Sequence, residues 1–156
     1  MTLVVSDASP LIALQQIAEL QLLQGLFGEV VIPPAVAREI SPSVKTLPSW
    51  LKTRSLQQPM AGEILHASLG AGETEAISLA QETRADWLLL DERPARRQAQ
   101  ALGLHVAGTF GLLNRAKEKG LLAAVRPCVE ALVRGGFHAT PALVKRILTE
   151  AGEREP

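Results

Sequence analysis

The 156-residue sequence has no tyrosine and little aromatic content of any kind, only 3%. Its core must therefore be aliphatic, and a hydrophobic fraction of 47% excludes general disorder. The single cysteine, Cys128, cannot form an internal disulfide. No apolar run is long enough to cross a bilayer, and no basic flank precedes the apolar residues near Met1. We expect a cytoplasmic protein of one domain, residues 1–156, whose tail from about 152 to 156 is frayed.

The chain also lacks an excess of charge of either sign, because 16 basic residues balance 16 acidic ones. A net charge of zero gives no long-range field that would attract nucleic acid, so a broad DNA-coating surface is not expected. Local clusters of cations can still bind phosphate groups.

Short apolar runs alternate with helical patterns along the chain. The runs predict strands at 2–6, 29–32, 86–90 and 104–106, with a minor strand near Leu56. The helical patterns cover 10–27, 34 to about 40, 60–69, 70–83, 94–102, 109–119, 121–134 and 140–151. Continuous apolar strands that alternate with helices predict a three-layer α/β/α sandwich with a mainly parallel central sheet.

Carboxylates fall at the points where ligands bind in such a fold. Asp7 ends the first strand and Asp91 ends the third, so both should lie at the carboxyl edge of the sheet. Glu39 lies on the helix after the second strand, and Glu75 lies in the first turn of the helix before the third. Converging carboxylates repel one another unless cations hold them, and oxygen ligands suit Mg²⁺ or Mn²⁺. Such a site suits hydrolysis of a phosphodiester by a metal-activated water.

Each acid also has an ordinary structural explanation. Asp7 and Asp91 are both suitable helix N-caps, and Glu39 is equally suited to a solvated helix face. Glu73 is the rival of Glu75, because it follows Gly72 in the same glycine-rich turn. The two glutamates are separated by about 200° around a helix, so only one of them should face a metal. We choose Glu75, which leads the apolar face, and interpret Glu73 as a first-turn acid that complements the helix dipole.

Four segments resemble, in order and spacing, the blocks of PIN domains, the nuclease fold of VapC-type toxins. They are VSDASPLI (5–12), VIPPAVAREI (31–40), EAISLA (75–80) and LLDE (89–92). Segments 70–77, 108–113 and 135–137 are most similar to a PIN-like branch of uncharacterised bacterial and archaeal proteins. The resemblance covers nearly the whole chain.

The resemblance implies a ribonuclease site that depends on Mg²⁺ or Mn²⁺, often a homodimer and, in toxin relatives, an antitoxin partner. By position, the acidic site would comprise Asp7, Glu39, Glu75 and Asp91. Asp7 and Asp91 would bind the metal directly, and Glu75 directly or through water, although aspartate more often stands at this position. Glu39 would orient a water, and Glu92 would replace or supplement Asp91.

Four further residues are candidates for contact with the RNA backbone. Thr109 begins a helix at the same edge, so its hydroxyl and backbone N–H are placed to meet a phosphate. Arg93, Arg96 and Arg97 form a local cation cluster, although a solvated face explains them equally well.

The leading prediction is a metal-dependent endoribonuclease that hydrolyses RNA phosphodiester bonds, with the toxin of a toxin–antitoxin pair as one form of it. The alternative is a catalytically weak or inactive PIN-like scaffold that binds nucleic acid or protein through apolar helices near 11–27 and 121–134. A phosphatase or receiver domain is disfavoured, because Ser9 stands where a phosphatase needs a second aspartate.

Overall fold

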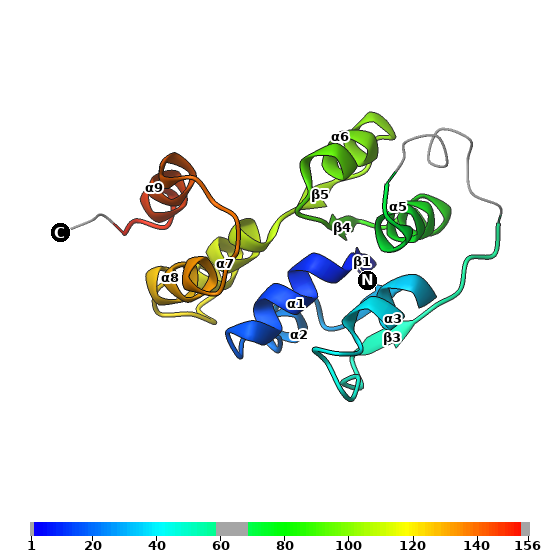
Figure 1. The fold of residues 1–156 in the computed structure, drawn as a ribbon, viewed down its shortest axis with the longest axis horizontal. Helices are drawn as coiled ribbons and strands as arrows, with labels where there is room; N and C mark the ends of the chain where they lie inside the picture. The colour runs from blue at the N-terminus through cyan, green and yellow to red at the C-terminus, as the bar shows by residue number, and fades with distance from the viewer. Residues whose placement is uncertain (1, 59–68, 154–156) are drawn as a thin grey trace.

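The computed structural model describes residues 2–58 and 69–153, and an all-parallel sheet lies at their centre (Figure 1). The sheet has five strands among the described residues, in the order β3-β2-β1-β4-β5. The strands are β1 (Val4–Ser6), β2 (Val30–Ile32), β3 (Leu51–Thr53), β4 (Trp87–Leu89) and β5 (Val106–Ala107). Residues of β1, β2 and most of β4 are fully buried, as expected for a parallel sheet covered on both faces. The predicted fold class is confirmed.

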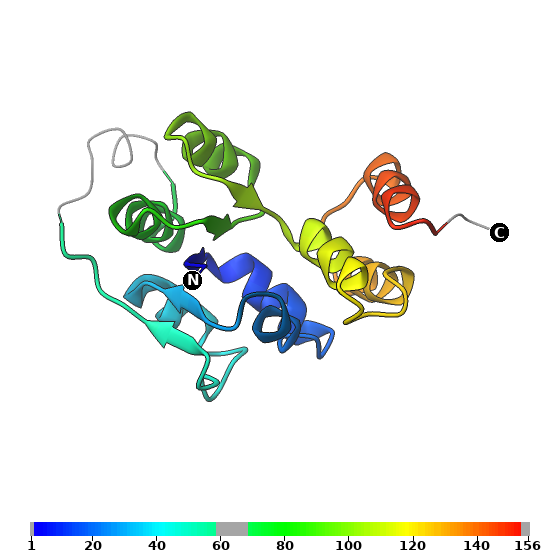
Figure 2. The same cartoon turned by 180° about the vertical axis from the view of Figure 1, so that it is seen from behind.

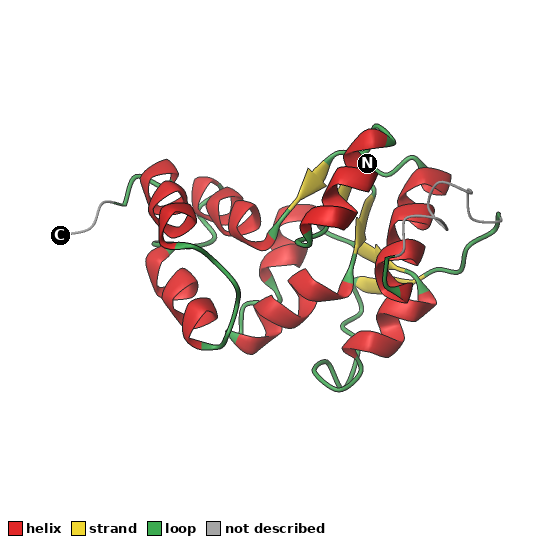
Figure 3. Ribbon diagram, turned by 45° about the horizontal axis from the view of Figure 1, so that its top comes forward, coloured by secondary structure: helices red, strands yellow, loops and turns green. Residues whose placement is uncertain are grey.

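Helices pack against the sheet (Figure 3). They are α1 (Ala8–Gln16), α2 (Leu22–Phe27), α3 (Pro34–Ile40), α5 (Ala71–Thr83), α6 (Arg93–Ala101), α7 (Thr109–Glu118), α8 (Arg126–Arg134) and α9 (Pro141–Glu150). In Figures 1 and 2 the strands lie between α5 and α6 on one side and α1 and α2 on the other, while α7, α8 and α9 gather beyond the end of the sheet. No described helix has both the length and the apolar character that crossing a bilayer would require.

The strand order reverses between β1 and β4. The chain builds outward from β1 through β2 to β3, and then returns to place β4 and β5 on the opposite side of β1. A parallel sheet opens a crevice at such a switch point, beyond the carboxyl ends of the strands. Asp7 directly follows β1 and Asp91 follows β4, so the topology places both at this crevice.

The core is aliphatic, as the lack of aromatic residues predicts. Leu11 of α1, Leu23 of α2, Ile77 of α5 and Leu113 of α7 are all fully buried around the strands. Cys128 is buried on α8 as a free thiol. Burial of this aliphatic surface fixes the helices that carry the acidic residues.

Three predicted elements differ from the observed ones. The predicted helix 10–27 is two helices, because Ala18 adopts a left-handed conformation (φ 58°) and Glu19 N–H closes the turn on Leu14 O at 2.8 Å. The minor strand predicted near Leu56 lies instead at β3, where Leu51 pairs with Val30 of β2. β3 has three residues, of which only Leu51 is buried, so the sequence shows no strand-like alternation of apolar and polar residues there.

The predicted helix 121–134 begins only at Arg126, where Pro127 stands in its first turn and fixes the helical start. The predicted helix 60–69 lies almost entirely outside the described residues.

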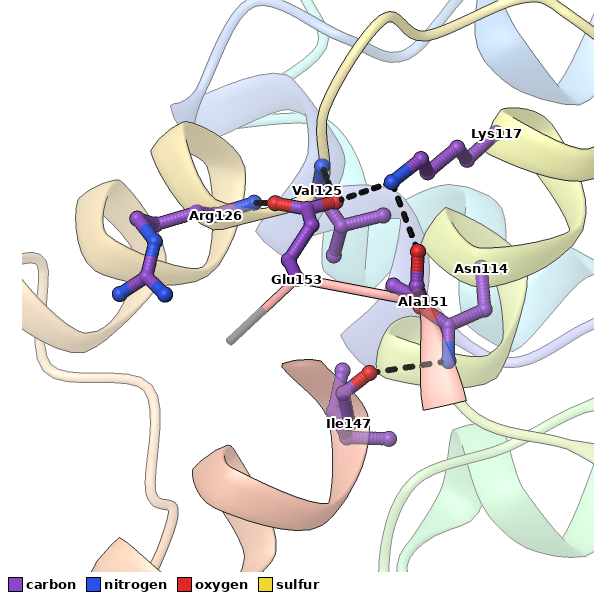
Figure 4. Close-up of polar contacts among 7 residues, drawn as sticks. All are labelled: Asn114, Lys117, Val125, Arg126, Ile147, Ala151 and Glu153. Carbon is purple, nitrogen blue, oxygen red and sulfur yellow. Dashed lines mark hydrogen bonds and ion pairs between the residues drawn. The ribbon is translucent and has the colours of Figure 1, made fainter. Parts of the chain in front are cut away.

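Of the tail predicted to fray, about 152 to 156, the structure describes residues 152 and 153, and residues 154–156 lie outside the described range. The Glu153 carboxylate accepts the backbone N–H groups of Val125 (2.7 Å) and Arg126 (2.9 Å) and the Lys117 ammonium (2.9 Å), as Figure 4 shows. Lys117 also donates to Ala151 O at 2.7 Å. Although burial opposes it, these hydrogen bonds lower the pKa of Glu153. These contacts tie the last described residues to the start of α8 and to α7.

Candidate functional site

Asp7 lies at the centre of the acidic site. It occupies the N-cap position of α1 without a side-chain capping hydrogen bond, and its side chain is only 3% exposed. Its backbone N–H donates to Leu89 O at 2.9 Å, which ties the residue to the end of β4. The Oδ1 atom is buried and has no hydrogen-bond partner among the described residues. Helix capping therefore does not explain this buried oxygen.

The pKa of Asp7 is raised to about 7, chiefly by burial; the Ala8 N–H lowers it, and the carboxylates of Glu73, Glu39 and Asp91 contribute to the rise. A carboxylate that is costly to ionise near neutral pH, beside other carboxylates, is arranged for a cation. The cause is general: a buried carboxylate beside other negative charges is poorly solvated and repelled when it ionises.

Asp91 is held rigidly by Thr109 at the start of α7. The Thr109 N–H donates to Asp91 Oδ1 at 2.8 Å, and the Thr109 hydroxyl donates to Oδ2 at 2.7 Å. Burial raises the pKa of Asp91, while the Thr109 hydrogen bonds and the Arg96 guanidinium lower it. Thr109 is fully buried, so it orients Asp91 and does not present its hydroxyl to solvent.

Glu39 reaches the site through a close approach to α5. Its Oε1 atom accepts the Gly72 N–H at 2.9 Å. A Cβ at position 72 would lie 2.5 Å from Glu39 Oε2 and 2.6 Å from Oε1, so only glycine leaves room for this carboxylate. The charges of Glu39 and Asp91 both act on Asp7.

The two rival glutamates of α5 have different surroundings. Glu75 Oε1 accepts the Ala35 N–H at 3.0 Å, and so caps the start of α3. Glu73 Oε1 accepts the Gly70 N–H at 3.2 Å, but its Oε2 is buried without a partner among the described residues. Burial raises the pKa of Glu73, and Glu92 and Glu39 add to the effect. Glu73, not Glu75, is therefore the residue of this helix whose charge acts on Asp7.

The three arginines of α6 differ in position. Arg96 is half-buried, and its guanidinium lies beside Asp91: a Cβ at Gly108 would be 2.6 Å from Arg96 Nη1 and 3.0 Å from Asp91 Oδ1. Arg93 is exposed and, with the exposed Glu92, lines the mouth of a groove at Asp91. Arg97 is exposed on the same helix and is not part of the groove lining.

A divalent cation fits the chemistry of this site. Two buried carboxylate oxygens, Asp7 Oδ1 and Glu73 Oε2, lack partners in the described part of the chain, and the neighbouring charges are all of one sign apart from Arg96. Within residues 2–58 and 69–153, however, no three His, Cys, Asp or Glu side chains already form a compact ligand set. Binding would thus draw in the flexible glutamates or use waters, as Mg²⁺ commonly does.

Beside the acids lies a groove of about 990 Å³. One wall is α1, the second is the segment 91–94, and the third is the segment 135–140 with α9. Sequence reasoning missed this feature, because it depends on how α8 and α9 fold back toward α1. It also preferred Glu75 to its rival Glu73, whose charge acts on Asp7.

Comparisons with known proteins agree with this geometry. A family model described as a PIN domain matches residues 3–153. A solved structure, a PilT N-terminus domain protein from the hyperthermophilic archaeon Sulfolobus solfataricus P2, superposes with a TM-score of 0.52 over 74% of this chain and 93% of that one. Their sequences are 19% identical, so this likeness concerns the fold alone. No match was found among curated proteins. The resemblance inferred from the sequence is confirmed.

Proposed function

Because the chain belongs to the PIN-domain family, whose members are generally nucleases, we propose that it is an endoribonuclease that uses Mg²⁺ or Mn²⁺ to hydrolyse phosphodiester bonds of RNA. The observation that carries the proposal is Asp7. It is a buried carboxylate at a strand end, with an unpartnered oxygen and a pKa raised to about 7 amid three other acids.

In the proposal Asp7, Asp91 and Glu73 hold the cation, and Glu39 orients a water. Glu75 stays the alternative to Glu73, although its carboxylate caps α3. A bound divalent cation supplies an activated water and stabilises negative charge on the phosphoryl group. Thr109 fixes the Asp91 carboxylate through two hydrogen bonds, which keeps one ligand in place without rearrangement.

Contacts with the phosphate backbone fall to the arginines. Both donors of Thr109 are used by Asp91, so we assign Thr109 a positioning role in place of direct substrate contact. Arg96, beside Asp91, is placed to neutralise the phosphate at the site, and Arg93 and Arg97 are placed to bind flanking phosphates.

The proposal is tested by cleavage of single-stranded RNA after metal removal with EDTA and readdition of Mn²⁺ or Mg²⁺. Asp7→Asn and Asp91→Asn should each lower the rate at least about a hundredfold, the scale on which loss of one charge-stabilising group acts. Glu130→Gln, at an exposed acid of α8, is the matched control and should cleave like the wild type. Cleavage that survives both aspartate changes, or that needs no metal, would contradict the proposal.

A second pair of variants decides between the two glutamates of α5. Glu73→Gln should abolish most activity, because it removes one of the carboxylates proposed to hold the cation. Glu75→Gln should leave activity near the wild-type level, because glutamine can still accept the Ala35 N–H. The reverse result would restore Glu75 as the site residue.

A non-cutting scaffold is the second candidate, because no ready-made ligand set exists among the described residues. Absence of Mg²⁺ and Mn²⁺ binding by calorimetry, together with absence of cleavage, would favour the scaffold.

We also propose that the protein forms a homodimer and binds an antitoxin protein in the cytoplasm. Leu121 and Val133, exposed by 41% and 43%, support an apolar interface, and the mass in solution by light scattering tests it.

A further inference from the structure

Helix α9 forms one wall of the groove, yet little apolar packing holds it in place. Of its ten residues only Ile147 and Leu148 are buried, and Leu143 and Val144 are half-buried. It packs on α7, and Figure 1 shows it beyond α7, away from the sheet. Because hydrophobic stabilisation scales with the apolar area removed from water, polar contacts must contribute much of what keeps α9 docked.

The polar contact between the middle of α7 and α9 is imperfect. Asn114 Nδ2 donates to Ile147 O over a long 3.4 Å, and Ile147 O already accepts the Ala151 N–H at 3.0 Å. The Asn114 Oδ1 atom is buried and has no hydrogen-bond partner in the part of the chain that the structure describes. A buried carbonyl oxygen without a partner opposes the burial that causes it. Docking of α9 on α7 therefore carries a local cost.

The Glu153 carboxylate offsets this cost. It accepts the Val125 and Arg126 N–H groups at the start of α8 and the Lys117 ammonium of α7 (Figure 4). Backbone N–H groups at the start of a helix have no partner within the helix, so Glu153 satisfies donors that water would otherwise occupy. Hydrogen bonds to a charged group are stronger than those between neutral groups. The best-made polar contact of this region thus lies after the end of α9.

Glu153 is joined rigidly to α9. Gly152 has a left-handed conformation (φ 76°), and the Glu153 N–H donates to Leu148 O at 2.7 Å, which closes the end of the helix. At the other end the Thr140 hydroxyl oxygen accepts the Leu143 N–H at 3.1 Å and caps the first turn. Residues 140–153 are therefore one unit, here called the C-terminal wall, and its carboxylate moves with its helix.

The C-terminal wall has a natural hinge. Phe137 is held on the core side, because its ring packs on the buried Phe110 ring with centroids 5.1 Å apart and its N–H donates to Leu132 O at 2.9 Å. Only residues 138 and 139, which lie outside any helix or strand, separate Phe137 from the start of the wall. Rotation about this link would move the wall while α7 and α8 stay in place.

We propose that the C-terminal wall undocks as a unit when Glu153 leaves the start of α8, and that this opens the groove beside Asp91. Ala142, Leu143 and Arg146 of the wall line the same groove as Asp91 and Glu92, so release removes one of its sides. The Glu153 carboxylate thus controls the width of the path to the acidic residues. Elements held by few buried apolar contacts are those that open below the global unfolding free energy.

Hydrogen exchange of the metal-free protein tests whether the wall opens as a unit. The Val125 and Arg126 amides and those inside α9 should show one common opening equilibrium, although they lie far apart in the sequence. This opening should be at least about tenfold more frequent than that of the Asp7 amide, which donates to Leu89 O in the centre of the sheet. Amides of α9 as well protected as Asp7, or unrelated to Val125 and Arg126, would overturn the proposal.

Three variants connect this opening to the contacts described. Glu153→Gln should raise the opening of α9 at least about tenfold, by the scale of hydrogen bonds to a charged group. Asn114→Leu should lower it, because it removes the unpartnered oxygen. Glu150→Gln, at an exposed acid of the same helix, is the matched control and should change it by less than about threefold.

Two results would contradict the role of these contacts. If Glu153→Gln exposes only the Val125 and Arg126 amides and not α9, the carboxylate merely caps α8 and the proposal is overturned. If Glu153→Gln does not fold, Asn114→Leu decides alone, and faster exchange of α9 in that variant would overturn the proposal.

Thiol labelling tests whether the groove itself opens. Ala13 lines the groove from α1 and is only 5% exposed, and Ala80 of α5 is fully buried and does not line it. In a Cys128→Ala background, which removes the native thiol, Ala13→Cys should be labelled at least about tenfold faster than Ala80→Cys, and Glu153→Gln should speed its labelling further. Equal labelling of the two cysteines would overturn the opening of the groove. Neither measurement uses RNA or metal, so each result holds whether or not the acidic site cleaves RNA.

Discussion

At the scale of single residues, Asp7 is an acid that folding makes hard to ionise. Its burial is set by β1 and α1, which are themselves fixed by aliphatic packing. The three nearby acids add to the cost of its negative charge. The site therefore stores an electrostatic penalty that a divalent cation relieves, which couples metal binding to the stability of the fold.

This penalty predicts an unusual dependence of stability on pH in the absence of metal. The pKa of Asp7 is about 7 in the folded protein and 3.8 as a model value, so the folded state binds this proton more tightly. Its contribution is fully present below about pH 4 and is lost as the pH rises through about 7. Over that range the loss is up to about 4 kcal/mol, at 1.36 kcal/mol per pH unit.

Urea unfolding in EDTA from about pH 5 to about pH 8 measures the effect, and the free energy of unfolding should fall. Asp7→Asn should flatten this fall, leaving the smaller parts from Glu73 and Asp91, whose pKa values burial also raises. Mn²⁺ should restore the stability of the wild type at the higher pH. A wild type that becomes more stable with rising pH in EDTA would contradict the argument.

The sequence was a good guide to single acids where a strand ends. Asp7 and Asp91 follow apolar runs, and parallel topology alone brings them to one edge. Its choice of Glu75 over Glu73 was less secure, because helical geometry separates them by about 200° without saying which direction faces the sheet edge. That choice depends on the docking of α5 on α3, where Ala35 N–H takes the Glu75 carboxylate.

At the scale of elements, the pairing of α3 with α5 positions two of the candidate acids, Glu39 and Glu75. Two hydrogen bonds cross between the helices: Gly72 N–H to Glu39, and Ala35 N–H to Glu75. Both use backbone donors from the first turn of a helix, which have no partner within the helix itself. The carboxylates thus satisfy helix ends and at the same time fix the spacing of α3 and α5.

Gly72→Ala tests this pairing. The added Cβ would overlap the Glu39 carboxylate, at 2.5 to 2.7 Å, and the flexible glutamate must swing away. We expect the affinity for Mn²⁺, measured by calorimetry, to fall about tenfold or more, as when a supporting residue of a metal site is lost.

Gly111→Ala is the control for Gly72→Ala. Gly111 lies in α7 with open space around its Cβ position, so alanine there should stabilise the protein by about 1 kcal/mol and leave metal affinity unchanged. Wild-type metal affinity in Gly72→Ala would show that Glu39 is not part of the site.

Elements with strong periodicity were predicted well, and those that depend on tertiary context were not. The strands at Val4, Val30 and Trp87 are apolar runs that only a buried sheet accommodates. In contrast, β3 has one buried residue and exists because its backbone pairs with β2. The break between α1 and α2 comes from a left-handed alanine, a conformation that the sequence does not signal.

At the scale of the whole molecule, the last described residue holds the C-terminal helices to the rest. Glu153 accepts two N–H groups at the start of α8 and pairs with Lys117 of α7, 36 residues earlier in the chain. Asn114 of α7 also donates to Ile147 O of α9, at 3.4 Å (Figure 4). Because α9 forms one wall of the groove, these contacts position that wall.

Glu153→Gln should destabilise the protein by about 1–3 kcal/mol, the range for a hydrogen-bonded charge that loses its partners. Glutamine keeps one acceptor for Val125 or Arg126 but leaves the Lys117 ammonium without its ion pair. Glu150→Gln is the matched control, because Glu150 is an exposed acid 3.7 Å from Arg146, and its loss should cost less than about 0.5 kcal/mol.

The hydrogen bonds lower the pKa of Glu153, so its contribution to stability is present above about pH 4.5 and is lost as the pH falls through the lowered value. The difference in unfolding free energy between wild type and Glu153→Gln, measured in urea, should therefore shrink in acid, whereas the Asp7 effect grows there. Equal stability of the two glutamine variants at neutral pH would show that the C-terminal segment is held by its apolar contacts alone.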